Sequence, residues 1–133
     1  KYETGPRKGL NFGHTIGHAV ESYYLAQGKK LLHGEAVAIG IICEAYISCV
    51  KGCLQRTDYL PILQLIGKVF TGLPYLQPDA IPAIVKLTGN DKKNAAGQNR
   101  FTLLNGIGNF SVDNYVEEET VINSLHYYSQ LSR

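Results

Sequence analysis

The sequence has little net charge, no long apolar run and few cysteines, and each absence narrows the range of functions. Its 13 lysines and arginines nearly balance 11 aspartates and glutamates, for a formal charge of +2. This balance excludes a strongly basic nucleic-acid-binding protein and an acidic tail protein, but it leaves room for a local basic pocket that binds an anionic small molecule. The longest apolar segment, residues 36–50, contains Glu44 and is shorter than the roughly 18 residues of a membrane span, so no span is predicted.

The three cysteines, Cys43, Cys49 and Cys53, are odd in number and lack Cys-x-x-Cys spacing. This pattern predicts free thiols in a reducing compartment, and therefore a cytoplasmic protein. A cysteine-based metal site is the alternative interpretation.

With 133 residues, of which 44% are hydrophobic and 18% charged, the chain is long and apolar enough for one globular domain. It begins with Lys1 rather than methionine. We therefore expect residues 1–133 to be a single domain of a longer protein, with a site that another part of that protein helps to form.

Apolar spacing and turn residues predict a mainly α-helical domain with one small β-hairpin. Apolar residues recur at three- and four-residue steps in several segments, and two short strand-like segments flank a turn that begins at Asn105. Segment 34–52 is apolar on all sides in its interior, which is typical of a buried central helix. The predicted helices are 8–27, 34–52, 58–70, 78–87 and 117–131, and the predicted strands are 100–104 and 109–112.

Polar side chains that can carry chemistry form one stripe along the first predicted helix. Arg7, Asn11, His14 and His18 follow one another at steps of four, three and four residues. At 3.6 residues per turn they share a helix face turned away from the apolar stripe.

Two glycines, Gly13 and Gly17, lie beside this stripe. Each costs a helix about 1 kcal/mol relative to alanine. Their presence predicts that another backbone or a ligand approaches closely at this place.

The histidines of the stripe have the spacing of a metal site. His14 and His18 are four residues apart and can direct two imidazoles at one point, and His33 returns to the same region if the next helix runs antiparallel. From spacing alone, either all three histidines bind a metal, or two bind it while the third transfers protons. A structural coincidence is the remaining alternative. The fourth histidine, His126, is interpreted as structural.

Two further groups of charged residues are candidates for substrate binding. Lys92 and Lys93 occupy a polar, glycine-bounded loop, where they form either a solvated surface or a clamp for phosphate or carboxylate. Glu3 and Arg7 lie one turn apart if their segment is helical, which is also the spacing of an ordinary local ion pair.

Four segments of the sequence resemble the C-terminal half of 3-dehydroquinate synthase, in the same order and across essentially the whole chain. A bare His-x-x-x-His also fits iron-dependent alcohol dehydrogenases and glycerol dehydrogenases, whereas the Asn-Phe-Gly-His-Thr run and the Asp-Lys-Lys-Asn loop favour the synthase family. The four segments are residues 10–19, 32–40, 91–94 and 100–104.

The resemblance implies the fold and activity of that family. The full enzyme has an N-terminal domain that binds NAD and a helical C-terminal domain that holds most metal and substrate contacts, and it acts as a homodimer. With zinc or cobalt, this lyase converts DAHP, a phosphorylated keto-acid, into 3-dehydroquinate and phosphate in the shikimate pathway of aromatic amino acid biosynthesis. An isolated C-terminal domain is therefore expected to be inactive.

The resemblance also implies roles for individual residues. His14 and His33 match metal ligands, and the family's third ligand is a glutamate of the N-terminal domain. His18 matches a histidine that hydrogen-bonds substrate and relays protons, and Glu3 matches a carboxylate implicated in proton handling. The residues that match those holding the substrate are Arg7, Asn11, His18, His33 and one of Lys92 and Lys93.

Two other functions compete with this interpretation. The first is another sugar-phosphate cyclase, such as a deoxy-scyllo-inosose or aminodehydroquinate synthase. Arg7 and the loop at residues 91–94 discriminate between the two functions, because a substrate without a carboxylate does not need them. A non-catalytic helical domain that associates through an apolar face is the other, and it would take up no zinc.

Overall fold

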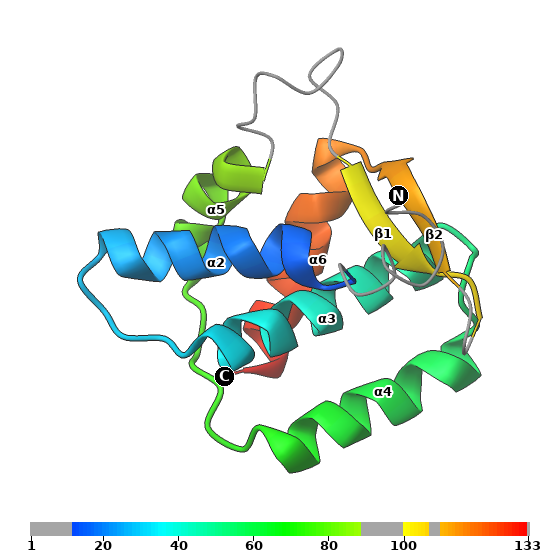
Figure 1. The fold of residues 1–133 in the computed structure, drawn as a ribbon, viewed down its shortest axis with the longest axis horizontal. Helices are drawn as coiled ribbons and strands as arrows, with labels where there is room; N and C mark the ends of the chain where they lie inside the picture. Colours follow the sequence, from blue (N-terminus) through cyan, green and yellow to red (C-terminus); the bar gives the residue numbers. More distant parts are fainter. Residues whose placement is uncertain (1–11, 89–99, 107–109, 133) are drawn as a thin grey trace, which may run out of the picture.

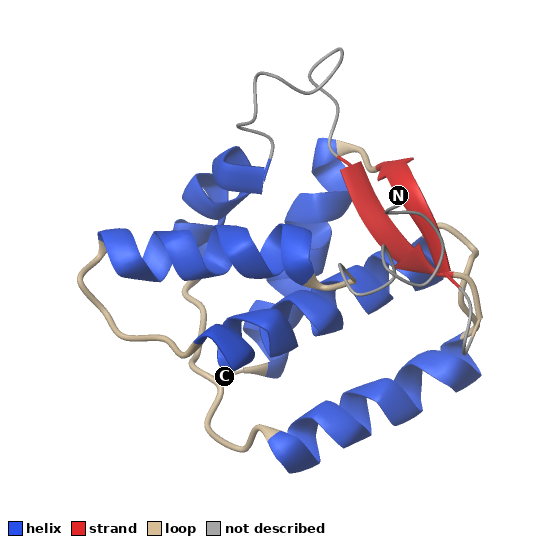
Figure 2. Cartoon of the chain, in the orientation of Figure 1, coloured by secondary structure: helices blue, strands red, loops and turns tan. Residues whose placement is uncertain are grey.

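Helices make up most of the part of the chain that the computed structural model describes, which is residues 12–88, 100–106 and 110–132. Figures 1 and 2 show these helices with one antiparallel hairpin, which confirms the predicted fold class. The elements in chain order are α2 (His14–Ala26), α3 (His33–Val50), α4 (Arg56–Val69), the 3-10 helix η1 (Pro78–Ala80), α5 (Ile81–Thr88), β1 (Arg100–Leu104), β2 (Phe110–Tyr115) and α6 (Glu118–Leu131).

Helix α3 is the centre of the domain, as its apolar sequence predicts. It contacts α2, α4, α6 and β1, and Figure 1 shows α2 and α4 on opposite sides of it. By length and composition alone α3 could cross a membrane, because the helix extends beyond the apolar segment 36–50. However, 56% of this stretch is buried inside the domain. Its burial, rather than its length, identifies α3 as a core helix.

Glycines allow α2 and α3 to come into backbone contact. A Cβ on Gly17 would lie 3.1 Å from the carbonyl oxygen of Ala36 and 3.2 Å from the Cα of Val37. A Cβ on Gly40 would overlap the carbonyl oxygen of Gly13 and lie 2.7 Å from the backbone nitrogen of Gly17. From the sequence, either another backbone or a ligand could approach Gly13 and Gly17. In the structure it is the backbone of α3.

The hairpin packs against the same central helix. β1 pairs antiparallel with β2, with Leu104 opposite Phe110 and a shift in register between Phe101 and Leu103. Phe101 and Leu103 are buried in the core. The N–H of Leu104 donates to Ser48 Oγ on α3 at 3.0 Å, which fixes the strand to the helix.

Element boundaries differ from the predicted ones by a few residues. Helix α4 begins at Arg56 rather than at residue 58, and β2 continues to Tyr115. The predicted helix 78–87 divides into η1 and α5, and Pro78 and Pro82 each stand in the first turn of one of them, where a missing N–H is tolerated. The first predicted helix, 8–27, is wrong at its start: α2 begins at His14, because residues 12 and 13 form a turn in which Gly13 has a φ of 86°, so no continuous helix carries the predicted stripe through Gly13. Residues 8–11 lie outside the described residues. The cysteines are free thiols, as predicted.

Gly40→Ala should lower the free energy of unfolding by about 2–4 kcal/mol, because the added methyl group would overlap the Gly13 carbonyl and force α2 and α3 apart. Gly67→Ala is the matched control. Gly67 is an exposed residue of α4 with nothing within 4 Å of an added Cβ, so helix propensity alone should raise stability by up to about 1 kcal/mol. Urea unfolding followed by circular dichroism measures both effects. Equal effects of the two substitutions would contradict the backbone contact.

Candidate functional site

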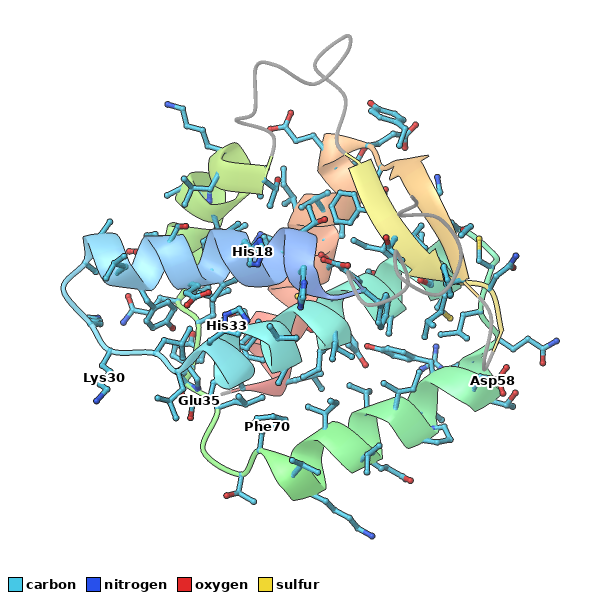
Figure 3. All side chains as sticks on the ribbon, viewed as in Figure 1. His18, Lys30, His33, Glu35, Asp58 and Phe70 are labelled. Carbon is cyan, nitrogen blue, oxygen red and sulfur yellow. The ribbon has the colours of Figure 1, made fainter. Side chains whose placement is uncertain are left out.

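Three imidazoles from two successive helices lie together where α2 meets the start of α3. The ring centroids of His14 and His18 are 5.2 Å apart, and that of His33 lies 6.1 Å from each of them. His14 is the first residue of α2, and His33 is the first residue of α3. Figure 3 shows His18 on α2 beside His33 at the start of α3.

The turn after α2 brings His33 back to the first two histidines. Gly28 adopts a positive φ of 71°, and its N–H donates to the carbonyl of Leu25 at 3.0 Å. The following N–H, that of Lys29, donates to the carbonyl of Tyr24 at 3.0 Å. This is a Schellman ending, in which a left-handed glycine satisfies the last helical carbonyls and redirects the chain. The predicted stop at Gly28 is therefore confirmed.

A carboxylate fixes the start of α3, next to His33. Glu35 Oε1 accepts the N–H of Leu32 at 3.1 Å. Leu32 is the cap residue and has no polar side chain, so its own side chain cannot accept an N–H in return. Glu35 thus holds the backbone and leaves the His33 imidazole to other partners.

A buried carboxylate fixes the start of α2. Glu44, in α3, is fully buried; its Oε1 accepts the N–H of Gly13 and its Oε2 accepts the N–H of Ile16, each at 2.8 Å. A helix is usually capped by a side chain of its own first residues, but the cap position of α2 is Gly13, so the next helix supplies the cap. Burial raises the pKa of Glu44 to about 8, although hydrogen bonds from Ile16, Gly13 and Thr15 act in the opposite direction.

The electrostatics of the cluster favour a neutral His14. Burial lowers the pKa of His14, and the neighbouring His18 and His33 lower it further. An imidazole must be neutral to bind a metal ion. The surroundings of His14 therefore favour the protonation state that a metal ligand needs.

One polar partner of the cluster, Glu21, was missed by the sequence interpretation. Its Oε1 lies 2.9 Å from Nδ1 of His33. A signal was present, because Glu21 follows His18 by three residues and so lies on the same face of α2. Its pairing with a histidine on another helix depends on the turn between the helices, which spacing alone does not determine.

The spacing of the rings suits a zinc-sized cation bound by two of them. With Zn–N bonds of about 2.0–2.1 Å and tetrahedral angles, two imidazoles on one ion have centroids roughly 5 Å apart. The observed separations are 5.2 Å and 6.1 Å. Within the described ranges, however, no group of three His, Cys, Asp or Glu residues has the arrangement to hold a metal ion. A metal at these rings would need a further ligand from outside the described residues.

The structure places part of the predicted site. It brings His14, His18 and His33 together. His126, interpreted as structural, is exposed on α6. The predicted site residues that lie outside the described residues are Glu3, Arg7, Asn11, Lys92 and Lys93.

A cavity of about 520 Å³ lies beside α4 and the end of α6. Its lining comes mainly from α4 and the end of α6 and includes Leu63, Phe70, Tyr128 and Leu131. None of the three clustered histidines lines it. The lining comes near the cluster at Phe70, whose ring lies 3.8 Å from the position of a Cβ on Gly34, the residue next to His33.

Sequence comparison relates the chain to one enzyme family. Residues 1–94 match the family model described as 3-dehydroquinate synthase C-terminal. A 3-dehydroquinate synthase of Parabacteroides distasonis is 36% identical over 128 residues, which cover 96% of this chain and 36% of the relative. A 3-dehydroquinate synthase of Xanthomonas oryzae pv. oryzae is 42% identical over 129 residues, which cover 92% of this chain and 34% of that relative. The chain thus spans about a third of the length of the curated relatives it matches.

Solved structures share the fold. A structure of 2-deoxy-scyllo-inosose synthase complexed with carbaglucose-6-phosphate, NAD+ and Co2+ has a TM-score of 0.75 and 25% identity, over 95% of this chain and 35% of that one. A 2-epi-5-epi-valiolone synthase from Streptomyces hygroscopicus subsp. jinggangensis, with NAD+ and Zn2+ bound, has a TM-score of 0.71 over 92% of this chain and 33% of that one. At 24% identity, this second structure supports the fold alone.

The match to 2-deoxy-scyllo-inosose synthase, at a TM-score of 0.74 and 26% identity, places this helical fold in a class, the C-terminal domains of sugar-phosphate cyclases. Within that class, the family model and the identities of 36% and 42% to two 3-dehydroquinate synthases point to one family. The chain belongs to the 3-dehydroquinate synthase family, a family of lyases, and matches its C-terminal domain.

Glu44→Gln should lower the free energy of unfolding by about 2 kcal/mol. The amide keeps the shape of the side chain but has one accepting oxygen, so one of the buried N–H groups of Gly13 and Ile16 loses its partner. Glu119→Gln, at an exposed position of α6, is the control and should change stability by less than about 0.5 kcal/mol. Chemical denaturation of both variants measures the difference. Equal stability of both variants would show that the Glu44 cap contributes nothing.

Acidification should destabilise the chain through His14. The pKa of His14 is lower in the folded chain than its ordinary value of 6.5, so the unfolded chain binds this proton first as the pH falls. This contribution to stability is fully present above the unfolded pKa and is lost as the pH falls through the folded pKa. Urea unfolding at a series of pH values between about 7.5 and 5 should show a steeper loss of stability for the wild type than for His14→Gln. Parallel pH profiles of the two proteins would contradict this prediction.

Proposed function

We propose that this chain is the metal- and substrate-binding domain of a 3-dehydroquinate synthase that converts DAHP into 3-dehydroquinate and phosphate in the shikimate pathway. The observation that carries the proposal is the gathering of His14, His18 and His33 at one point in a chain of this family. Burial and the two neighbouring imidazoles lower the pKa of His14, so the cluster favours the neutral ring that a metal ligand needs.

In this proposal His14 and His33 hold a zinc or cobalt ion, which when bound supplies Lewis-acid polarisation of the substrate. The lowered pKa of His14 supports its role as a ligand. The centroids of His14 and His33 lie 6.1 Å apart, about 1 Å more than for two imidazoles on one zinc ion, so this pairing requires the rings to move slightly closer when the ion binds. His18, exposed and 5.2 Å from His14, remains for hydrogen bonding to substrate and for proton transfer.

The anionic groups of the substrate require cationic and amide donors at two ends. We assign this work to Arg7, Asn11 and one of Lys92 and Lys93, with Glu3 in proton handling. All of them fall within residues 1–94, which match the family model. A planar guanidinium suits bidentate binding of carboxylate or phosphate, whereas lysine acts as a mobile point charge.

The rest of the enzyme is proposed to lie in a longer protein. The chain corresponds to about a third of its relatives' length, and a related cyclase structure holds NAD+ and Co2+. We therefore assign NAD binding and the third metal ligand, a glutamate, to an N-terminal domain, and we place the protein in the cytoplasm as a homodimer. In that arrangement residues 1–133 are a single helical C-terminal domain.

Another sugar-phosphate cyclase is the second candidate function, because the matched structure of 2-deoxy-scyllo-inosose synthase has a TM-score of 0.74 over 95% of this chain. Its identity is 26%, against 36% for the 3-dehydroquinate synthase of Parabacteroides distasonis. The substrates separate the two functions, because DAHP carries a carboxylate and the sugar phosphate of the alternative does not.

The 133-residue chain alone should release no phosphate from DAHP in the presence of NAD and zinc, whereas the longer protein should turn it over. In that protein, His14→Ala and His33→Ala should each lower kcat/KM by more than the roughly 100-fold loss typical of changes around a ligand. His126→Ala, on the exposed face of α6, is the control and should leave activity unchanged. Phosphate release measures all of these.

Three results would contradict the proposal. Robust turnover by the isolated chain would remove the need for a second domain. Full activity of His14→Ala would remove the metal assignment. Preference of the longer protein for a sugar phosphate without a carboxylate would select the alternative cyclase.

A further inference from the structure

The carboxylate of Glu21 meets a ring atom of His33 across the junction of two helices. Glu21 Oε1 lies 2.9 Å from His33 Nδ1, and the side chains are 36% and 60% exposed. An ionised carboxylate offers only acceptors, so the hydrogen of this bond is on Nδ1. The lone pair of the neutral ring is then on Nε2, the nitrogen that Glu21 does not contact.

Two observations separate this contact from an ordinary surface ion pair, which contributes little and leaves its side chains free to turn. First, the ring that Glu21 holds lies 6.1 Å from both His14 and His18, so its direction decides whether the three imidazoles converge. Second, Glu35, the acidic residue nearest to His33 in sequence, already accepts the N–H of Leu32 at 3.1 Å. One carboxylate thus fixes the backbone at the start of α3, and the other fixes the ring.

We propose that Glu21 is a positioning residue that sets the tautomer and direction of the His33 imidazole, so that Nε2 is available to a divalent cation. The proposal rests on the proposed function, in which His33 is a metal ligand. Histidine ligands commonly donate their second ring N–H to a carboxylate, and loss of such a partner typically lowers metal affinity by about 10–100-fold. Nothing in the spacing of the sequence pairs these two residues; the turn at Gly28 does.

The first test needs no metal. Nitrogen-15 NMR of the histidine rings in the metal-free chain, at a pH where His33 is neutral, should show His33 mainly with its hydrogen on Nδ1. Glu21→Ala should remove that preference, whereas Glu21→Gln should keep most of it, because the amide oxygen can still accept the Nδ1 hydrogen. Glu119→Gln, a carboxylate removed from the exposed face of α6, should leave the His33 signals unchanged. The same mixture of tautomers in the wild type and in Glu21→Ala would overturn the proposal.

The second test measures cobalt(II) binding by calorimetry and by the visible spectrum of the ion. Glu21→Ala should weaken cobalt binding by about 10–100-fold, with Glu21→Gln in between. Adding Glu21→Ala to His33→Ala should cause no further loss, because a positioning residue acts only through the ring it holds. An equal loss in both backgrounds would mean that Glu21 acts as a general negative charge and would overturn the proposal.

The two tests also separate this proposal from the proposed function. A wild type that binds no cobalt, alone or within the longer protein, overturns the metal assignment and with it the role of Glu21 toward a metal. The NMR result would then still report the Glu21–His33 contact by itself. A wild type that binds cobalt as tightly as Glu21→Ala overturns the positioning role alone.

Discussion

The backbone contact between α2 and α3 is the constraint on which the rest of the structure depends. Helices usually pack with their axes 8–10 Å apart, because side chains stand between them. Here Gly13, Gly17 and Gly40 contribute no side chain of their own to the contact, so backbone atoms of the two helices approach each other directly, with the side chain of Ile41 beside Gly13. Short side chains such as imidazole can then reach a common point from two helices. The histidine cluster is therefore a consequence of how closely the two backbones approach.

The same contact explains why a carboxylate is buried in the apolar helix. Removing a carboxylate from water is costly unless hydrogen bonds compensate for the lost hydration. Because α2 begins against the middle of α3, both oxygens of Glu44 reach N–H groups of the first turn of α2 that have no partner within their own helix. Together with Glu35 and the turn at Gly28, this cap fixes the ends of the two helices that carry the rings. A site held in this way by groups outside its own side chains has its geometry before any ligand arrives.

Much of the fold could be predicted from the sequence, because its signals are local. Apolar periodicity, the stop at Gly28 and the all-apolar α3 each report on a few neighbouring residues, and all of them are found in the structure. The proximity of the three histidines also followed from helical spacing and an antiparallel return. The partner of His33 and the cap supplied by Glu44 did not, because each joins residues that only the packed helices bring together. From the sequence alone, Glu44 is a single charged residue within an apolar segment, and Glu21 is a polar residue on the exposed face of its helix. Neither position indicates the partner that the residue has in the structure.

Two of the three clustered histidines, His18 and His33, are exposed. Charge-stabilising chemistry is strongest where water is excluded, because electrostatic interactions strengthen as the local dielectric falls. Yet His18 is exposed, His33 is 60% exposed, and none of the three histidines lines the cavity beside α4 and α6. Within the described residues the rings also lack a third ligand for a metal. In the proposed function, a further segment over the junction of α2 and α3 would supply both the ligand and the exclusion of water. In the proposed function the helical domain contributes part of the site, and the Glu44 cap, Glu35 and the turn at Gly28 hold the helix ends that carry His14 and His33.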